Sequence, residues 1–230
     1  MNRVLSIARI QSIAWVAFVW PPAIMVTSLL INIALFAAIG DKISGTHDTG
    51  GVSSIYIVEL IVASQMVTQF FSFTAGLGAT RRAFYLGTGA VVLAQSLVYG
   101  LGLYVLKLIE LATDGWGVQL GFFDPIPLTH SESPVQILVY VVPMLLLGVL
   151  GLFLGVVAKR WGSNGIFTTS LGALVLLGAA AVLITWTGSW AAVGHWFATQ
   201  PGLALAAGWT LIPLVALGYG AYGLLRRATP

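Results

Sequence analysis

Two adjacent arginines, Arg81 and Arg82, carry the strongest local chemical signal in this 230-residue chain. They stand in the stretch GLGATRRAFYLGT, residues 76–88, between two long apolar segments. A guanidinium offers a planar fork of N–H donors to carboxylate or carbonyl groups, and it is costly to place in hydrocarbon. The pair therefore predicts a turn at a membrane boundary, where it either binds a docked partner or only fixes the orientation of the chain.

A second group of polar residues forms a stripe in the apolar segment before this turn. Its members stand at positions i, i+3, i+4 and i+7, and they are Gln65, Thr68, Gln69 and Ser72. Residues at this spacing share one face of a helix, and a polar face is costly to expose to lipid. It indicates either a substrate path or a hydrogen-bonded contact with a neighbouring helix. Glu59, nearer the outer end, is expected to reach water, with a proton relay as a lesser alternative.

Residue types suited to catalysis or metal binding are few. The chain has no cysteine and three histidines, and its sequence contains no P-loop, G-x-S-x-G or H-E-x-x-H pattern. The acidic and histidine residues of one outer segment match no known metal-ligand spacing, and they are Asp114, Asp124, His130 and Glu132. We therefore expect no catalytic group, no metal site and no cofactor in this chain.

The composition indicates an integral membrane protein. Hydrophobic residues make up 58% of the chain and charged residues 7%, whereas about a quarter of the residues in a soluble domain are charged. A bilayer core about 30 Å thick needs roughly 20 apolar residues in a helix. Six segments qualify, near residues 20–40, 54–79, 84–112, 135–158, 165–187 and 203–225. We predict an all-α membrane protein with six transmembrane helices in a single transmembrane domain, residues 1–230.

The basic residues predict how these spans are oriented. All but Lys42 and Lys107 fall on one side, and they are Arg3, Arg9, Arg81, Arg82, Lys159, Arg160, Arg226 and Arg227. All of the acidic residues fall at or near the opposite side. Because Lys and Arg concentrate in cytoplasmic loops, both termini are predicted to be cytoplasmic. The basic residues form small groups at helix ends rather than one massed face, so a nucleic-acid partner is not expected.

Several segments depart from plain spans. Residues 1–13 are predicted to form an amphipathic interfacial helix, with one long first span as the alternative, and Pro21 and Pro22 suit a break or first turn. The aromatic residues of segment 114–134 suit the interfacial belt. Residues 188–202 contain no Asp, Glu, Lys or Arg and predict either a re-entrant or an interfacial helix. Gly151 and Gly155 form a weak G-x-x-x-G packing signal.

The whole arrangement resembles the membrane subunits of ABC-2 type ABC transporters, the exporter permease family. The most local match is to a Gly-x-Ser/Thr-Arg-Arg-x-Phe/Tyr turn, and here it reads Gly78, Ala79, Thr80, Arg81, Arg82, Ala83 and Phe84. The resemblance implies that two permeases, identical or related, enclose a path through a bacterial inner membrane. It also implies two copies of a cytoplasmic ATPase subunit that bind ATP and Mg, and contact with membrane lipids.

By this resemblance the N-terminal helix and the first cytoplasmic turn contact the ATPase, and the coupling residues are Thr80, Arg81, Arg82, Arg3 and Arg9. The polar stripe on the second span is then the candidate translocation path. A secondary transporter or a membrane scaffold is the alternative, and an intramembrane enzyme is less favoured. Proton-driven transport is expected to need ionisable residues near the bilayer midplane, and we expect none there.

Overall fold

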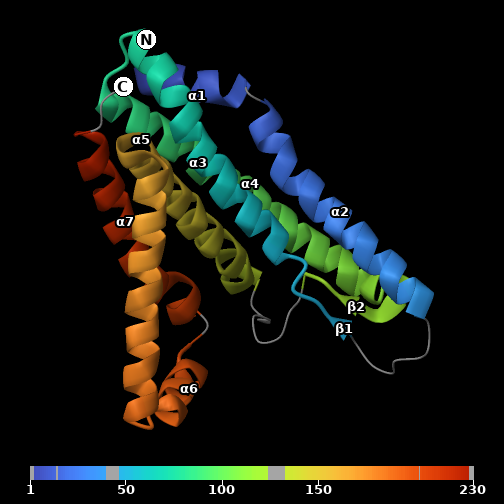
Figure 1. Ribbon diagram of the computed structural model, residues 1–230. Helices are drawn as coiled ribbons and strands as arrows, with labels where there is room; N and C mark the ends of the chain where they lie inside the picture. Colours follow the sequence, from blue (N-terminus) through green and yellow to red (C-terminus); the bar gives the residue numbers. More distant parts are fainter. Residues whose placement is uncertain (1–2, 14, 40–46, 124–132, 202, 228–230) are drawn as a thin grey trace.

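The computed structural model describes residues 3–13, 15–39, 47–123, 133–201 and 203–227, and these are almost entirely helical (Figure 1). The α-helices are α1 (Arg3–Ile13), α2 (Trp15–Ile39), α3 (Ser53–Gly76), α4 (Arg81–Ala112), α5 (Ser133–Trp186), α6 (Trp190–Thr199) and α7 (Trp209–Leu225). Two single π-helical turns, η2 (Gly115–Gln119) and η3 (Ala204–Gly208), and two short strands, β1 (His47–Asp48) and β2 (Leu120–Gly121), complete the described elements. The strands pair in parallel.

Four helical segments in this part of the chain are long and apolar enough to cross a membrane. They are Phe18–Ala38, Ser53–Gly76, Arg81–Ala112 and Pro134–Trp186. Helix α7 is also apolar but shorter. The predicted all-helical class with membrane-length helices is therefore confirmed, whereas the count of six spans stays a prediction.

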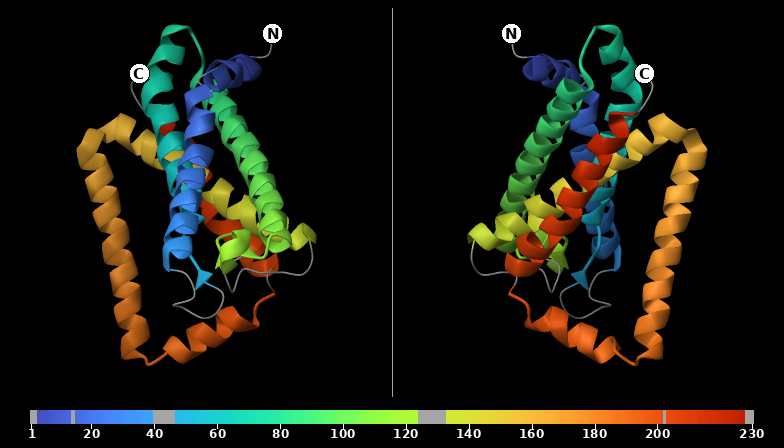
Figure 2. Two further views of the ribbon diagram at one scale, coloured as in Figure 1. Left: turned by 90° about the vertical axis from the view of Figure 1, so that its right-hand side faces the viewer. Right: turned by 90° about the vertical axis from the view of Figure 1, so that its left-hand side faces the viewer.

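Helix α5 covers residues 135–158 and 165–187, which the sequence predicts as two separate spans. Two helices meet there across a kink at Gly162, whose φ of 65° and ψ of −156° are not helical. The 53 residues from Pro134 to Trp186 would measure about 80 Å in a straight helix, far more than a bilayer core about 30 Å thick. The bend turns the second part of α5 away from the other helices (Figure 2), so this part must cross separately if six spans exist.

Helix α1 lies across one end of the bundle rather than continuing α2 (Figure 1). It packs on α4, where Ile7 faces Gly87 so closely that an added Cβ would lie 3.0 Å from the Ile7 side chain. Gln11 Nε2 also donates a hydrogen bond to Thr88 Oγ1 at 2.9 Å. Helix α1 is therefore separate from α2, and its place at the membrane surface stays a prediction. The expected break at Pro21 and Pro22 is wrong, because α2 runs through both prolines, as membrane helices tolerate.

Small residues let α3 and α5 approach closely, and this contact is the most extensive one between the described elements. A Cβ added at Gly155 would lie 2.7 Å from the Ser64 carbonyl oxygen and 2.9 Å from Val67 Cβ. One at Gly151 would lie 2.9 Å from Ala63 Cβ. The weak G-x-x-x-G pattern therefore corresponds to a backbone contact between two helices, as small residues at membrane-helix interfaces permit.

Cysteine labelling tests both the orientation and the number of spans, because the chain has no native cysteine. Exposed positions stand at both ends of the relevant helices: Thr80 and Ser163 at the basic end, and Thr113 and Thr187 at the other. We expect an impermeant thiol reagent to label Thr113→Cys and Thr187→Cys in intact cells and to spare the other two variants. Labelling of Thr80→Cys would reverse the orientation, and a shielded Thr187→Cys would contradict a separate crossing by the second part of α5.

Candidate functional site

One end of the bundle collects most of the basic residues. The two termini, α1, the turn between α3 and α4 and the bend of α5 all lie there (Figure 1). The basic residues on these elements are Arg3, Arg9, Arg81, Arg82, Lys159, Arg160, Arg226 and Arg227. The acidic residues that the structure describes lie in β1, in the first half of α3 and at or just beyond the end of α4, and they are Asp48, Glu59, Glu110 and Asp114. The predicted charge separation is thus present in three dimensions.

The turn between α3 and α4 is built by local capping and carries both arginines into solvent. Gly78 has a φ of 76°, a conformation that suits glycine, and Thr80 Oγ1 accepts a hydrogen bond of 3.2 Å from Ala83 N. Thr80 is therefore the N-cap of α4. Arg81 and Arg82 follow in the first helical turn, and both are exposed.

Arg81 connects this turn to the end of α7. Its Nη1 donates a hydrogen bond of 2.5 Å to the backbone oxygen of Arg226. The structure thereby brings three of the predicted coupling residues, Thr80, Arg81 and Arg82, together with the C-terminal helix. Arg3 and Arg9 lie on α1 at the same end, although their side chains are outside what the structure describes.

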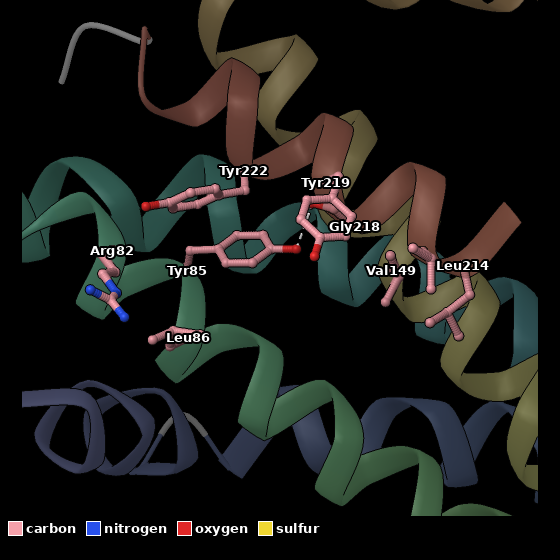
Figure 3. Close-up of a pocket in the computed structure, with 9 residues that line it drawn as sticks. Arg82, Tyr85, Leu86, Val149, Leu214, Gly218, Tyr219 and Tyr222 are labelled. Atoms are coloured by element: carbon pink, nitrogen blue, oxygen red, sulfur yellow. Dashed lines mark hydrogen bonds between the residues drawn. The ribbon is translucent and has the colours of Figure 1, made fainter. Parts of the chain in front are cut away.

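Arg82 borders a groove that the sequence did not predict (Figure 3). The groove has a volume of about 570 Å³ and lies between α4, α5 and α7. Its aromatic wall is made by Tyr85, Tyr219 and Tyr222; Tyr85 donates a hydrogen bond of 2.7 Å to the Gly218 carbonyl. These rings come from helices far apart in the chain, so no local pattern could have indicated the groove. Apolar walls with one cationic end suit an amphipathic molecule.

The polar stripe on α3 points out of the chain rather than into its core. Gln65, Gln69 and Ser72 are exposed, whereas Thr68 is half-buried and donates hydrogen bonds to backbone oxygens of its own helix. Lys159 Nζ donates a hydrogen bond of 2.6 Å to Ser72 Oγ. An outward polar stripe on a membrane helix is unfavourable against lipid, which favours either a water-filled path or a second subunit on this face.

Glu59 does not reach water, contrary to the expectation from its place in the sequence. Its side chain is fully buried between α3, α4 and α5. Neither carboxyl oxygen has a hydrogen-bond partner in the described part of the chain. A Cβ added at Gly148 of α5 would lie 3.5 Å from Oε1. The cause is the close packing of α5 on α3, which sequence spacing alone does not reveal.

A second carboxyl group, Glu110, organises the end of the bundle opposite the basic residues and was not singled out from the sequence. Its Oε2 accepts hydrogen bonds from Trp116 Nε1 at 2.9 Å and from Phe122 N at 3.0 Å. Phe123 N donates to both carboxyl oxygens at 3.1 Å. Phe122 and Phe123 are fully buried, so the interfacial role predicted for them is wrong. Backbone N–H donors leave no pattern in a sequence, so the sequence does not indicate that Glu110 binds the amides of Phe122 and Phe123.

The remaining predicted segments give mixed outcomes. Helix α6 lies crosswise between the ends of α5 and α7 (Figure 2), an arrangement that favours the interfacial alternative for residues 188–202. Within the described residues no group of three His, Cys, Asp or Glu could hold a metal ion. Asp124, His130 and Glu132 lie outside those residues.

Comparisons with protein families, with curated proteins and with solved structures found no match to this chain. Helix length and hydropathy define a candidate multi-pass membrane protein. Any more specific function rests on its own residues and their geometry.

Proposed function

We propose that this chain is the permease subunit of an ATP-driven exporter resembling the ABC-2 type, and that it lies in a bacterial inner membrane with both termini in the cytoplasm. The observation that carries the proposal is the exposed Arg81–Arg82 turn, which lies beside α1 at the basic end and is hydrogen-bonded to the end of α7. A cytoplasmic ATPase with acidic or carbonyl groups on its docking surface would find fixed guanidinium donors there.

The turn offers a route from a docked ATPase to the membrane helices. A displacement of the turn moves the start of α4, and the Arg81 hydrogen bond to Arg226 O links that displacement to α7. The groove bordered by Arg82 lies between these same two helices and α5. Its shape would therefore change with the turn, provided that the nucleotide states of the ATPase bind the turn with different affinities. ATP and Mg act in that partner, which is present in two copies.

The outward polar stripe supports a second permease, identical or related, on the open side of α3. Gln65 and Gln69 would then face a path enclosed by two subunits. A contact between subunits made only by hydrogen bonds is the competing explanation for the stripe.

Replacing both arginines by lysine separates docking from orientation. We expect Arg81→Lys with Arg82→Lys to keep the membrane level and topology, because the orientation rule counts either charge. ATPase binding and transport-coupled hydrolysis should fall about tenfold, because lysine lacks the planar donor fork. The measurements are co-purification of the ATPase and its hydrolysis rate in reconstituted vesicles.

The matched control is Arg227→Lys, which makes the same exchange at the same end but outside the turn. Wild-type hydrolysis and transport in the double variant would reduce Arg81 and Arg82 to orientation signals. Flux that follows a pH gradient without any ATPase would favour the secondary transporter, and activity of the chain alone on a lipid or peptide would favour the enzyme.

Leucine at Gln65 and Gln69 tests the path. If these side chains face a substrate path, the double variant should change the transport rate or cargo preference severalfold while two permeases still assemble. Transport assays and cross-linking of the assembled complex measure the two effects. Loss of assembly would instead assign the stripe to subunit packing, and Ser53→Leu, an exposed polar residue at the start of the same helix, is the control.

A further inference from the structure

A second hollow lies at the basic end, on the side of α7 toward the bend of α5. It has a volume of about 640 Å³, and its lining residues are Arg160, Gly220, Gly223, Leu224, Arg226 and Arg227. It shares no lining residue with the tyrosine groove. Arg160 comes from α5 and the other two arginines follow α7, so packing of two helices brings the three guanidinium-bearing residues to one pocket.

The positive charge of this pocket favours the binding of an anion. The described acidic residues all lie away from the basic end. The α7 C-terminus contributes roughly half a negative charge, as does that of the first part of α5. Three full positive charges outweigh these two partial ones. Arg160 is also held in place over the Trp161 ring, with its Cζ 4.5 Å from the ring centroid. The pocket is therefore cationic, and one of its three guanidinium groups is positioned by a neighbouring ring.

The shape and position of the pocket select the source of that anion. Gly220 and Gly223 have no side chains, so the α7 side of the pocket is open. A Cβ added at Gly223 would meet nothing within 4 Å. The arginines stand where the apolar sequence of α7 ends, so a headgroup at this level leaves its acyl chains beside apolar helix surface. Basic pockets between membrane helices bind anionic lipid headgroups, and Arg forms paired hydrogen bonds with phosphate.

We propose that this pocket binds the phosphate group of an anionic phospholipid. The site does not depend on the proposed transport function, because its residues lie outside the Arg81–Arg82 turn and the polar stripe. The Arg81 hydrogen bond to Arg226 uses the backbone oxygen of Arg226 and not its guanidinium group. A lipid held there would bridge the bend of α5 and the end of α7. Free inorganic phosphate offers the same chemistry, and the experiment distinguishes the two sources.

The test counts phosphatidylglycerol molecules retained by the purified full chain in micelles that also contain phosphatidylcholine, by native mass spectrometry. We expect selective retention of phosphatidylglycerol, and weakening by about fivefold for each arginine removed in Arg226→Gln with Arg227→Gln. Gly223→Phe should fill the pocket and weaken retention at unchanged charge. Arg226→Lys with Arg227→Lys should bind more phosphatidylglycerol than the glutamine pair and less than the wild type, because lysine keeps the charge but lacks the paired donors. This comparison separates loss of charge from misfolding.

The charge-matched control is Arg82→Gln with Lys159→Gln, which removes two basic residues of the same end that do not line this pocket. Equal weakening by both glutamine pairs would mean general surface attraction and would overturn the site. Unchanged retention in Gly223→Phe would also overturn it. Displacement of the lipid by inorganic phosphate at equal concentration would assign the pocket to a free anion and contradict the lipid proposal.

Discussion

Leucine at Gly151 is expected to force α3 and α5 apart and to cause the largest loss of folded protein among single substitutions on α5. An added Cβ would lie 2.9 Å from Ala63 Cβ and still closer to the Leu60 carbonyl oxygen. Overpacking of a core usually costs about 1–3 kcal/mol. Two of the three nearest atoms, the Leu60 carbonyl oxygen and carbon, are backbone atoms. Backbone cannot rotate away as a side chain can, so we expect the upper end of that range or more.

Thermal unfolding of the purified chain in detergent measures the effect, together with the fraction that elutes as a single species. Gly172→Leu is the matched control, because it lies on the same helix and an added Cβ there meets nothing within 4 Å. A Gly151→Leu variant as stable as Gly172→Leu would show that α3 and α5 do not pack through this glycine.

The helical architecture follows from features that a single sequence carries. Apolar runs of sufficient length predict α2, α3 and α4 with boundaries close to those observed, because polar or turn-forming residues stand at the ends of each run. Gly78 and Thr80 mark the start of α4 by their known roles as a positive-φ residue and an N-cap. The placement of the arginines at one end follows from the same pattern.

Features that depend on contacts between distant segments could not be read in this way. The tyrosine groove needs α4 beside α7. The burial of Glu59 needs Gly148 of α5 to lie against it. In each case the partner residue is remote in sequence, and spacing within one helix carries no information about it.

The end opposite the basic residues shows the same limit most clearly, because one carboxyl group there organises a segment that has little regular structure. Asp114 and Trp116 adopt positive φ angles of 51° and 62°, which are uncommon for residues other than glycine. Such backbone persists only where its surroundings hold it in place. Glu110 supplies that support through Trp116 Nε1 and the amides of Phe122 and Phe123.

We therefore expect Glu110→Leu to release this segment and to lower the free energy of unfolding by about 3–5 kcal/mol, because it leaves two buried backbone donors and the partly buried Trp116 indole donor without an acceptor. Glu110→Gln should have a smaller effect, since its amide oxygen still accepts but its NH₂ group faces donors. Thermal unfolding measures the global loss, and protease cleavage between residues 113 and 123 reports release of the segment. Asp114→Asn, which neutralises an exposed neighbouring carboxylate, should change stability by less than about 0.5 kcal/mol. If Glu110→Leu were as stable and as protease-resistant as that control, the hydrogen bonds to Glu110 would not hold the segment. Its conformation would then depend on the packing of Phe122 and Phe123 alone.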